Sequence, residues 1–315
     1  MLTRRHIRIK VLQTLYALQK SPETSLDSYQ RFLKKSMDGV YSLYLLQLHF
    51  FKYFRDWSLR EVEARQKAYL ETSKSTFPDP LRFYNNSFLT QITESEVLFD
   101  QWDRRKMKQW YLNEKYVANV HASFTKSDAY LEYMNLEQVG YAEDKEIVML
   151  LFREFLAPDE GVYDFIEDEQ LTWIDDYPLV NTFILKRFSA ARKQTEDSYW
   201  LPELVVEDDD LDFGRKLLAK VALKYGEYAK EIEGKTPNWD QDRIAELDKL
   251  LLILGIAELL DFPSIPPKVS LNEYLEIAKE YSTPKSSLFI NGILDNLSTT
   301  YKEEGRLIKS GRGLL

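Results

Sequence analysis

The densest group of chemically active side chains lies in the first ten residues of the chain. The group consists of Arg4, Arg5, His6, Arg8 and Lys10. Residues 1–20 hold five basic residues and no acidic one. In a helix, these cations would lie at the positive end of the dipole, where each costs about 0.3–1 kcal/mol. Helix N–H groups and arginines there favour an incoming phosphate. The segment is therefore either a phosphate- or RNA-contacting surface or a solvated basic end.

An acidic cluster offers a second chemistry. Asp208, Asp209 and Asp212 match the DDxxD spacing of the all-α prenyl synthases. Carboxylates one helical turn apart can hold Mg²⁺ while substrate phosphates complete its octahedron. The pattern is short and no second Asp-rich motif accompanies it. An acidic linker or a charged helix start is the favoured interpretation, and an Mg²⁺-dependent prenyl synthase is the remote alternative.

Composition excludes most other catalytic classes. The chain has no cysteine, which removes disulfides, Cys-ligated zinc and thiol nucleophiles. Its three histidines, His6, His49 and His121, are too far apart for an HExxH site. No glycine-rich phosphate motif occurs, so dinucleotide-binding and P-loop classes fall away. We expect neither a cofactor nor a metal, and we expect a protein that is not an enzyme.

Charge and hydropathy bear on location. The net charge of −9 disfavours indiscriminate coating of nucleic acid or of an anionic membrane. The longest apolar run, 250–257, falls far short of the roughly 20 residues that span a bilayer. The basic N-terminus is not a convincing signal peptide, because polar residues interrupt its apolar stretch. We expect a soluble, cytoplasmic protein with no membrane partner.

The elements that position these residues are predicted to be helices. Apolar residues recur three or four apart and strand-like alternation is rare, so the chain is predicted to be all-α. In the first helix, over 3–19, Ile7, Val11, Leu15 and Leu18 form the buried stripe. Proline, glycine and polar breakers predict a helix pair over 25–72 that joins near Gly39, and a polar linker over 193–212. Further helices are predicted over 93–125, 142–156, 159–168, 176–191, 212–233, 241–261, 270–281 and 284–303.

Both ends of the chain carry a family pattern. The C-terminal third contains a helix ending in Glu258-Leu-Leu, then Pro267-Lys-Val-Ser-Leu-Asn-Glu-Tyr-Leu-Glu-Ile-Ala-Lys, and then Phe289-Ile-Asn-Gly-Ile-Leu-Asp. The first helix contains Arg4-Arg-His-Ile-Arg and Gln13-Thr-Leu-Tyr. These segments resemble the family of the bacterial transcription antitermination factor NusB. The resemblance covers roughly 1–20 and 211–303.

This resemblance implies a NusB-like helical bundle and a function. The implied protein binds boxA-like single-stranded RNA of ribosomal RNA leaders together with NusE, a small-subunit ribosomal protein, and acts on the RNA polymerase elongation complex. By position, the RNA contacts carried over are Arg4, Arg5, His6, Arg8, Lys285, Ser286 and Phe289. Phe289 would either stack on a base or be a core aromatic. The positions that would meet NusE are Tyr16 and Asp248.

The chain also departs from the family pattern. It is longer than the family usually is, so we expect N-terminal NusB-like helices over 1–74, a helical insertion and acidic linker over 75–205, a C-terminal bundle over 206–303 and a basic tail over 304–315. Pro267 and Lys285 differ from the family's usual residues. Asn272 is expected to tie a helix connection, and Gly292 to let two helices approach. A helical protein-interaction scaffold without RNA binding stays open, whereas an RNA cytosine methyltransferase is excluded by the absence of cysteine.

Overall fold

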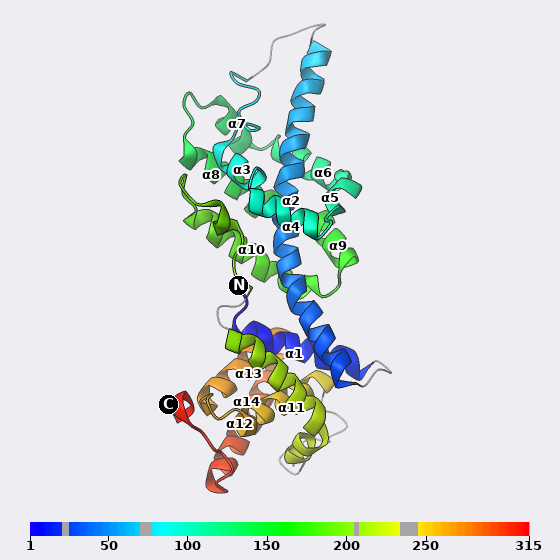
Figure 1. Ribbon diagram of the computed structural model, residues 1–315, viewed down its shortest axis with the longest axis vertical. Coiled ribbons are helices and arrows are strands. Elements are labelled where there is room, and N and C mark those ends of the chain that lie inside the picture. Colours follow the sequence, from blue (N-terminus) through cyan, green and yellow to red (C-terminus); the bar gives the residue numbers. More distant parts are fainter. Residues whose placement is uncertain (21–24, 70–76, 205–207, 234–244, 315) are drawn as a thin grey trace. The chain divides into compact units, whose positions relative to one another are not determined.

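The computed structural model describes residues 1–20, 25–69, 77–204, 208–233 and 245–314 (Figure 1). The described residues form helices and contain no β-strand, which confirms the all-α prediction. The chain divides into two compact units: unit 1 comprises 1–37 and 204–315, and unit 2 comprises 38–203. The boundaries expected near residues 74 and 205 lie outside the described residues.

Unit 1 contains the N-terminal helix and the C-terminal helices. Figure 1 shows α1 beside the C-terminal helices, and α1 contacts α11, α12 and α13. The helices are α1 (Arg4–Gln19), the first turns of α2 (Leu26–Tyr69), α11 (Asp208–Ile232), α12 (Glu246–Asp261), α13 (Pro267–Tyr281), α14 (Pro284–Glu303) and the short 3₁₀ helix η4 (Gly311–Leu314). Prolines start α13 and α14, where a missing N–H costs no helical hydrogen bond.

Helix α12 is the centre of unit 1. Every residue from Leu250 to Leu259 is buried, and the helix contacts α1, α11, α13 and α14. A helix that is apolar on all sides is stable only when neighbours surround it. The single charged side chain within that buried run is Glu258. Its carboxylate must therefore find its partners on the helices that pack around α12.

Close packing in unit 1 depends on Gly255 rather than on Gly292. A Cβ atom built at Gly255 would lie 2.8 Å from the Leu294 side chain, so glycine allows α14 to approach α12. A Cβ atom at Gly292 would meet nothing within 4 Å. The prediction for Gly292 is therefore wrong, because this residue faces away from neighbouring helices. The Asn272 side chain is exposed rather than tied into a connection.

Unit 2 is built around the rest of α2. The other elements are α3 (Ser87–Thr93), α4 (Glu96–Arg104), α5 (Gln109–Leu112), α6 (Glu114–Phe124), α7 (Asp128–Asn135), α8 (Tyr141–Leu150), the π-helical η1 (Leu151–Leu156), α9 (Glu160–Glu169), α10 (Trp173–Ala190) and the 3₁₀ helix η2 (Asp197–Trp200). Three indole N–H groups donate to backbone carbonyls of α2: Trp102 to Leu45 at 3.0 Å, Trp110 to Leu46 at 2.8 Å and Trp173 to Gly39 at 2.8 Å. Aromatic side chains thus serve as core and as polar anchors.

Three local predictions for this part of the chain are wrong. Residues 26–69 form one helix rather than a pair. Gly39 lies inside this helix, and its backbone carbonyl accepts the hydrogen bond from the Trp173 indole N–H. The helix predicted over 93–125 is three helices, and Lys106 between them has a positive φ of 51°. The predicted linker contains η2, whose Trp200 is fully buried and accepts a hydrogen bond from the Tyr44 hydroxyl on its carbonyl.

Candidate nucleic-acid interface

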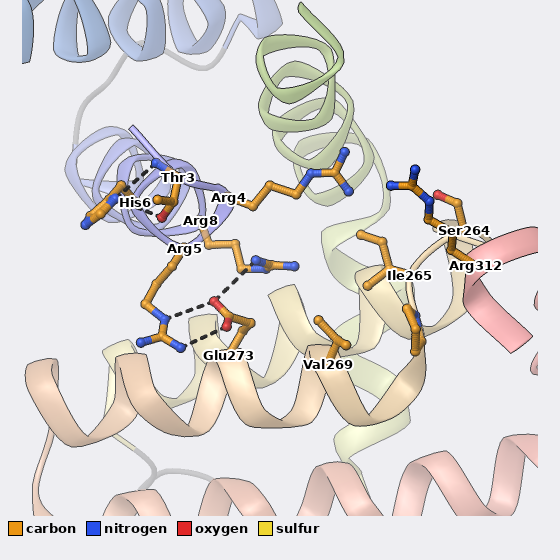
Figure 2. Close-up of a pocket in the computed structure, with 11 residues that line it drawn as sticks. Thr3, Arg4, Arg5, His6, Arg8, Ser264, Ile265, Val269, Glu273 and Arg312 are labelled. Carbon is orange, nitrogen blue, oxygen red and sulfur yellow. Dashed lines mark hydrogen bonds and ion pairs between the residues drawn. The ribbon is translucent and has the colours of Figure 1, made fainter. Parts of the chain in front are cut away.

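The N-terminal arginines line a cavity of about 600 Å³ within unit 1 (Figure 2). One wall is the start of α1, a second is the α12–α13 connection with the first turns of α13, and a third is the C-terminal tail. The lining residues are Thr3, Arg4, Arg5, His6, Arg8, Ser264, Ile265, Pro266, Val269, Glu273 and Arg312. Four guanidinium groups and one carboxylate therefore surround the cavity.

Arg8 lies in the protein interior. Its side chain is 2% exposed, and its Nε and one Nη donate to the two carboxylate oxygens of Glu258 at 2.8 and 2.7 Å. The hydroxyl groups of Ser270 and Tyr274 also donate to Glu258, at 2.7 and 3.1 Å. Burial alone would lower the pKa of Arg8, but the charge of Glu258 outweighs it and raises that pKa. This geometry gives Arg8 a structural role rather than the predicted RNA contact.

Arg5 lies at the edge of the cavity and pairs with Glu273 of α13. Its Nε and one Nη donate to the carboxylate at 3.0 and 2.8 Å. Burial acts to raise the pKa of Glu273, but the Arg5 hydrogen bonds and the nearby charge of Arg8 lower it below its usual range. The Arg5 side chain is 41% exposed. Its second Nη group therefore stays available to a ligand.

Arg4 pairs with α11 and keeps donors free. Its Nε donates to Asp210 at 2.7 Å, and the guanidinium lies 5.6 Å from the centre of the Phe213 ring. The side chain is 42% exposed. Since one donor is used for Asp210, both Nη groups can reach a further acceptor. Arg4 and Arg5 are thus the predicted contacts that suit an anionic ligand.

His6 closes the start of α1. Its Nδ1 accepts a hydrogen bond from the Thr3 N–H at 3.1 Å and lies 2.9 Å from the Thr3 hydroxyl oxygen (Figure 2). Burial, followed by the nearby charge of Arg5, lowers the pKa of His6. The imidazole is therefore neutral at pH 7, and its Nδ1 satisfies the Thr3 N–H at the start of the helix.

The predicted contacts on α14 lie apart from this cavity. Lys285, Ser286 and Phe289 occupy the first two turns of α14, and none of them lines it. Lys285 is exposed, whereas Ser286 and Phe289 are half-buried. The Ser286 N–H donates to the Thr283 hydroxyl at 3.1 Å, which caps the helix. Phe289 is therefore neither a buried core aromatic nor a fully open ring.

The two predicted partner residues differ in exposure. Tyr16 is 42% exposed on α1, whereas Asp248 is 5% exposed on α12. The Asp248 carboxylate accepts a hydrogen bond from the Ser282 hydroxyl at 2.6 Å. Lys20 and Glu246 form an ion pair of 2.6 Å, which brings the end of α1 to the start of α12. Tyr16 is therefore accessible at the surface, whereas Asp248 is buried and paired with Ser282.

The acidic motif does not assemble a metal site in the described residues. Asp210 pairs with Arg4, and Asp212 lies 3.5 Å from Lys216. The described residues contain no group of three or more carboxylates or histidines that could hold a metal ion. The side chain of Asp208 lies outside what the structure describes. The acidic residues therefore act as a charged helix start.

Sequence reasoning missed the carboxylates and the tail. Glu258, Glu273 and Arg312 are far from α1 in sequence, and only the packing of unit 1 brings them to the arginines. The signal for Glu258 was present, because a lone carboxylate in an apolar run demands a buried cation. No comparable signal pointed to Arg312.

None of the described helices combines the length and the apolar character needed to cross a membrane.

Comparison with known proteins places the chain in a family. A model described as the NusB family matches residues 183–299. Over 104 residues the chain is 43% identical to the transcription antitermination protein NusB of Salinibacter ruber, covering 33% of this chain and 65% of that protein. The match to NusB of Chloroherpeton thalassium is 46% over 116 residues, or 36% of this chain and 55% of that protein. NusB of Methylacidiphilum infernorum is 42% identical over 101 residues, or 32% of this chain and 68% of that protein.

The chain spans less than two thirds of the length of the first two of these relatives. All three are named as transcription antitermination proteins and none as an enzyme. No solved structure gave a significant match to the chain. The matched residues include α11 to α13 and most of α14, which form the bulk of unit 1. The extent of identity and the helical bundle around α12 together lead to one conclusion: the chain belongs to the NusB family.

Proposed function

We propose that the protein is an RNA-binding transcription antitermination factor. In this proposal it binds boxA-like single-stranded RNA of ribosomal RNA leaders together with NusE and acts on the RNA polymerase elongation complex in the cytoplasm. The observation that carries the proposal is the 42–46% identity to proteins named for transcription antitermination. The arginine-lined cavity supports the RNA-binding part, because phosphate groups are the ligands that guanidinium donors favour.

The proposed RNA surface has two parts. Arg4 and Arg5 are half-exposed, keep unused N–H donors and would contact backbone phosphates. Lys285, Ser286 and Phe289 on α14 would contact a nucleotide beside them, with the partly open Phe289 ring stacking on a base. Arg8 and His6 hold the start of α1 in place through Glu258 and Thr3. We therefore propose positioning roles for these two residues.

The proposed NusE surface lies at the other end of α1. Tyr16 presents a half-exposed aromatic ring, and the Lys20 ammonium lies 6.0 Å from the centre of that ring. Aromatic side chains are enriched where proteins associate, because they bury a large area with little loss of rotamer freedom. NusE bound here would add its own RNA contacts. Such a composite surface would offset the repulsion between RNA and a chain of net charge −9.

A reconstituted transcription assay tests the proposal. RNA polymerase would transcribe a template with a boxA-containing leader followed by a terminator, with and without the protein and NusE. We expect readthrough to rise when both proteins are present, and to fall back when the boxA segment is scrambled. Readthrough that the protein and NusE leave unchanged on the boxA template would contradict the proposed function.

A helical protein-interaction scaffold without RNA binding is the second candidate. The observation that favours it is the internal pairing of the arginines, since Arg4, Arg5 and Arg8 each have a carboxylate partner. A scaffold would bind NusE through Tyr16 but show no affinity for single-stranded RNA. Binding measurements with each ligand alone separate the two candidates.

A further inference from the structure

The C-terminal tail is fastened to the end of α12. The Lys309 ammonium donates to the backbone carbonyls of Glu258 and Phe262, at 3.4 and 3.0 Å. The Ser310 N–H donates to the Pro263 carbonyl at 2.9 Å. The last carbonyls of a helix lack intrahelical partners, and a cation placed there also interacts favourably with the helix dipole. These hydrogen bonds therefore give the tail a defined position on unit 1.

Gly313 allows the tail to lie close to the chain beneath it. The residue is buried, and a Cβ atom built on it would lie 1.9 Å from the Pro263 carbonyl oxygen. The obstacle is backbone, which cannot move aside as a flexible side chain would. Any other residue at position 313 would clash with this backbone and displace the tail from unit 1. The neighbouring Arg312 is thereby held at one place.

Arg312 lines the arginine cavity from the side opposite α1. Figure 2 shows the guanidinium groups of Arg4 and Arg312 extending toward one another. Arg312 is exposed, and within the described part of the chain it forms no ion pair. Each of the three α1 arginines has its own carboxylate partner. The positive charge of Arg312 is therefore the charge that the cavity leaves uncompensated.

We propose that Arg312 is a phosphate-binding residue, and that the docked tail completes a site for a backbone phosphate of single-stranded RNA together with Arg4. A phosphodiester carries one negative charge and accepts several hydrogen bonds, which matches one uncompensated guanidinium beside one with free donors. The proposal rests on the proposed RNA-binding function and deepens it. The tail lies beyond the residues that the family model matches, which end at 299, so the match itself assigns Arg312 no role.

The test compares four proteins in binding a single-stranded RNA oligonucleotide with a boxA-like sequence. They are the wild-type chain, Arg312→Gln, Gly313→Ala and the control Lys302→Gln. Lys302 is an exposed cation at the end of α14 that does not line the cavity, so its loss changes the net charge equally. We expect Arg312→Gln to weaken binding about tenfold, as the loss of one charge-assisted hydrogen bond does. The slope of log affinity against log salt should flatten by about 0.7.

Gly313→Ala keeps Arg312 but dislodges it, so it should weaken binding to a similar extent. Lys302→Gln should bind within about twofold of the wild type. If Arg312→Gln binds as Lys302→Gln does, the inference is overturned while the RNA-binding function stands. Circular dichroism of all four proteins should show the same helicity, since the substitutions lie outside the helical core.

Inorganic phosphate separates this site from the RNA function. Millimolar phosphate, compared with chloride at equal ionic strength, should raise the melting temperature of the wild type and not that of Arg312→Gln. If the wild type binds no RNA yet keeps this response, the phosphate site stands and its assignment to RNA fails. If both RNA binding and the phosphate response are absent in the wild type, the inference and the proposed function fail together.

Discussion

At the scale of residues, the α1 arginines differ in burial and in structural role although they are close in sequence. Arg8 is buried with Glu258, whereas Arg4 and Arg5 are about 40% exposed. Removing one partner of a buried ion pair leaves an uncompensated charge and costs about 3–5 kcal/mol. Removing an exposed partner costs about 0–1 kcal/mol. A sequence alone cannot separate these cases, because the partner carboxylates lie 206 to 268 residues away along the chain.

The first prediction follows from that difference. We expect Arg8→Ala to lower the free energy of unfolding of unit 1 by about 3–5 kcal/mol, and Arg4→Ala to lower it by less than about 1 kcal/mol. The double variant Arg8→Met with Glu258→Gln should recover much of the loss, because the amide oxygen still accepts from one of the Ser270 and Tyr274 hydroxyls and the amide N–H2 can donate to the other. Urea unfolding monitored by circular dichroism measures all three. Equal losses for Arg8→Ala and Arg4→Ala would show that Arg8 is not a structural residue.

The second prediction concerns two buried histidines in unit 2. Burial, followed by the charge of Lys52, lowers the pKa of His49 from 6.5 to about 3. Burial, followed by the charge of Arg65, lowers that of His121 from 6.5 to about 4. Below pH 6.5 the unfolded chain binds protons that the folded chain does not, so stability falls with pH down to these lower pKa values. At pH 5 each histidine should cost about 2 kcal/mol relative to pH 7.5.

A matched variant isolates the histidine effect. The Nδ1 of His49 finds no hydrogen-bond partner among the described residues, and its ring stacks on Trp102 with the ring centres 4.6 Å apart. His49→Phe should therefore be tolerated and should remove about half of the stability lost between pH 7.5 and pH 5. Urea unfolding at the two pH values measures this loss. An unchanged pH dependence in the variant would exclude His49 as its source.

At the scale of elements, one proline boundary was predicted and the glycine roles were not. Pro284 begins α14 at the predicted residue, whereas α13 begins at Pro267, three residues before its predicted start. The helix predicted over 93–125 is interrupted at Lys106, which has a positive φ of 51° that no glycine in the sequence signals. The close approach of α14 to α12 occurs at Gly255, which a helical pattern cannot distinguish from Gly292. Such features depend on contacts between distant helices.

The third prediction uses that pair of glycines. Gly255→Ala forces a methyl group to 2.8 Å from Leu294 and should destabilise unit 1 by about 1–3 kcal/mol. Gly292→Ala meets nothing within 4 Å and should stabilise α14 by about 0.5–1 kcal/mol, because alanine loses less conformational freedom in a helix. Thermal unfolding reports both shifts. A Gly292→Ala variant as unstable as Gly255→Ala would mean that the two positions are packed alike.

At the scale of the whole molecule, the family pattern and the compact units divide the chain in a consistent way. The segments that suggested the family, 1–20 and 211–303, belong to unit 1. The existence of a second helical body was predictable from aromatic content and helical periodicity. Its extent was not, because α2 runs without a break from unit 1 residues into unit 2 residues and no proline or linker marks the division. The position of the tail on α12 could not be predicted from the sequence either, since single backbone contacts leave no periodic pattern of residues.

The fourth prediction concerns assembly with NusE. Tyr16→Asp places a charge on the proposed contact surface. The wild-type ring there is 42% exposed, so it contributes little to the stability of the fold. We expect the variant to lose association with NusE in analytical ultracentrifugation and to keep its melting temperature within a few degrees. Asp248→Lys should instead lower the melting temperature, because it buries a charge without a partner and breaks the Ser282 hydrogen bond. Tyr16→Asp that still associates normally would remove Tyr16 from the interface.

The most direct test of RNA binding is a salt titration with single-stranded RNA. Fluorescence anisotropy would give the affinity of the wild type and of Arg4→Gln with Arg5→Gln for a boxA-like oligonucleotide at several salt concentrations. With about three phosphates contacted, the slope of log affinity against log salt should be about −2, and the double variant should flatten it by about 1.4. Wild-type affinity and slope in the double variant would contradict RNA binding at this cavity, and the scaffold function would then take its place.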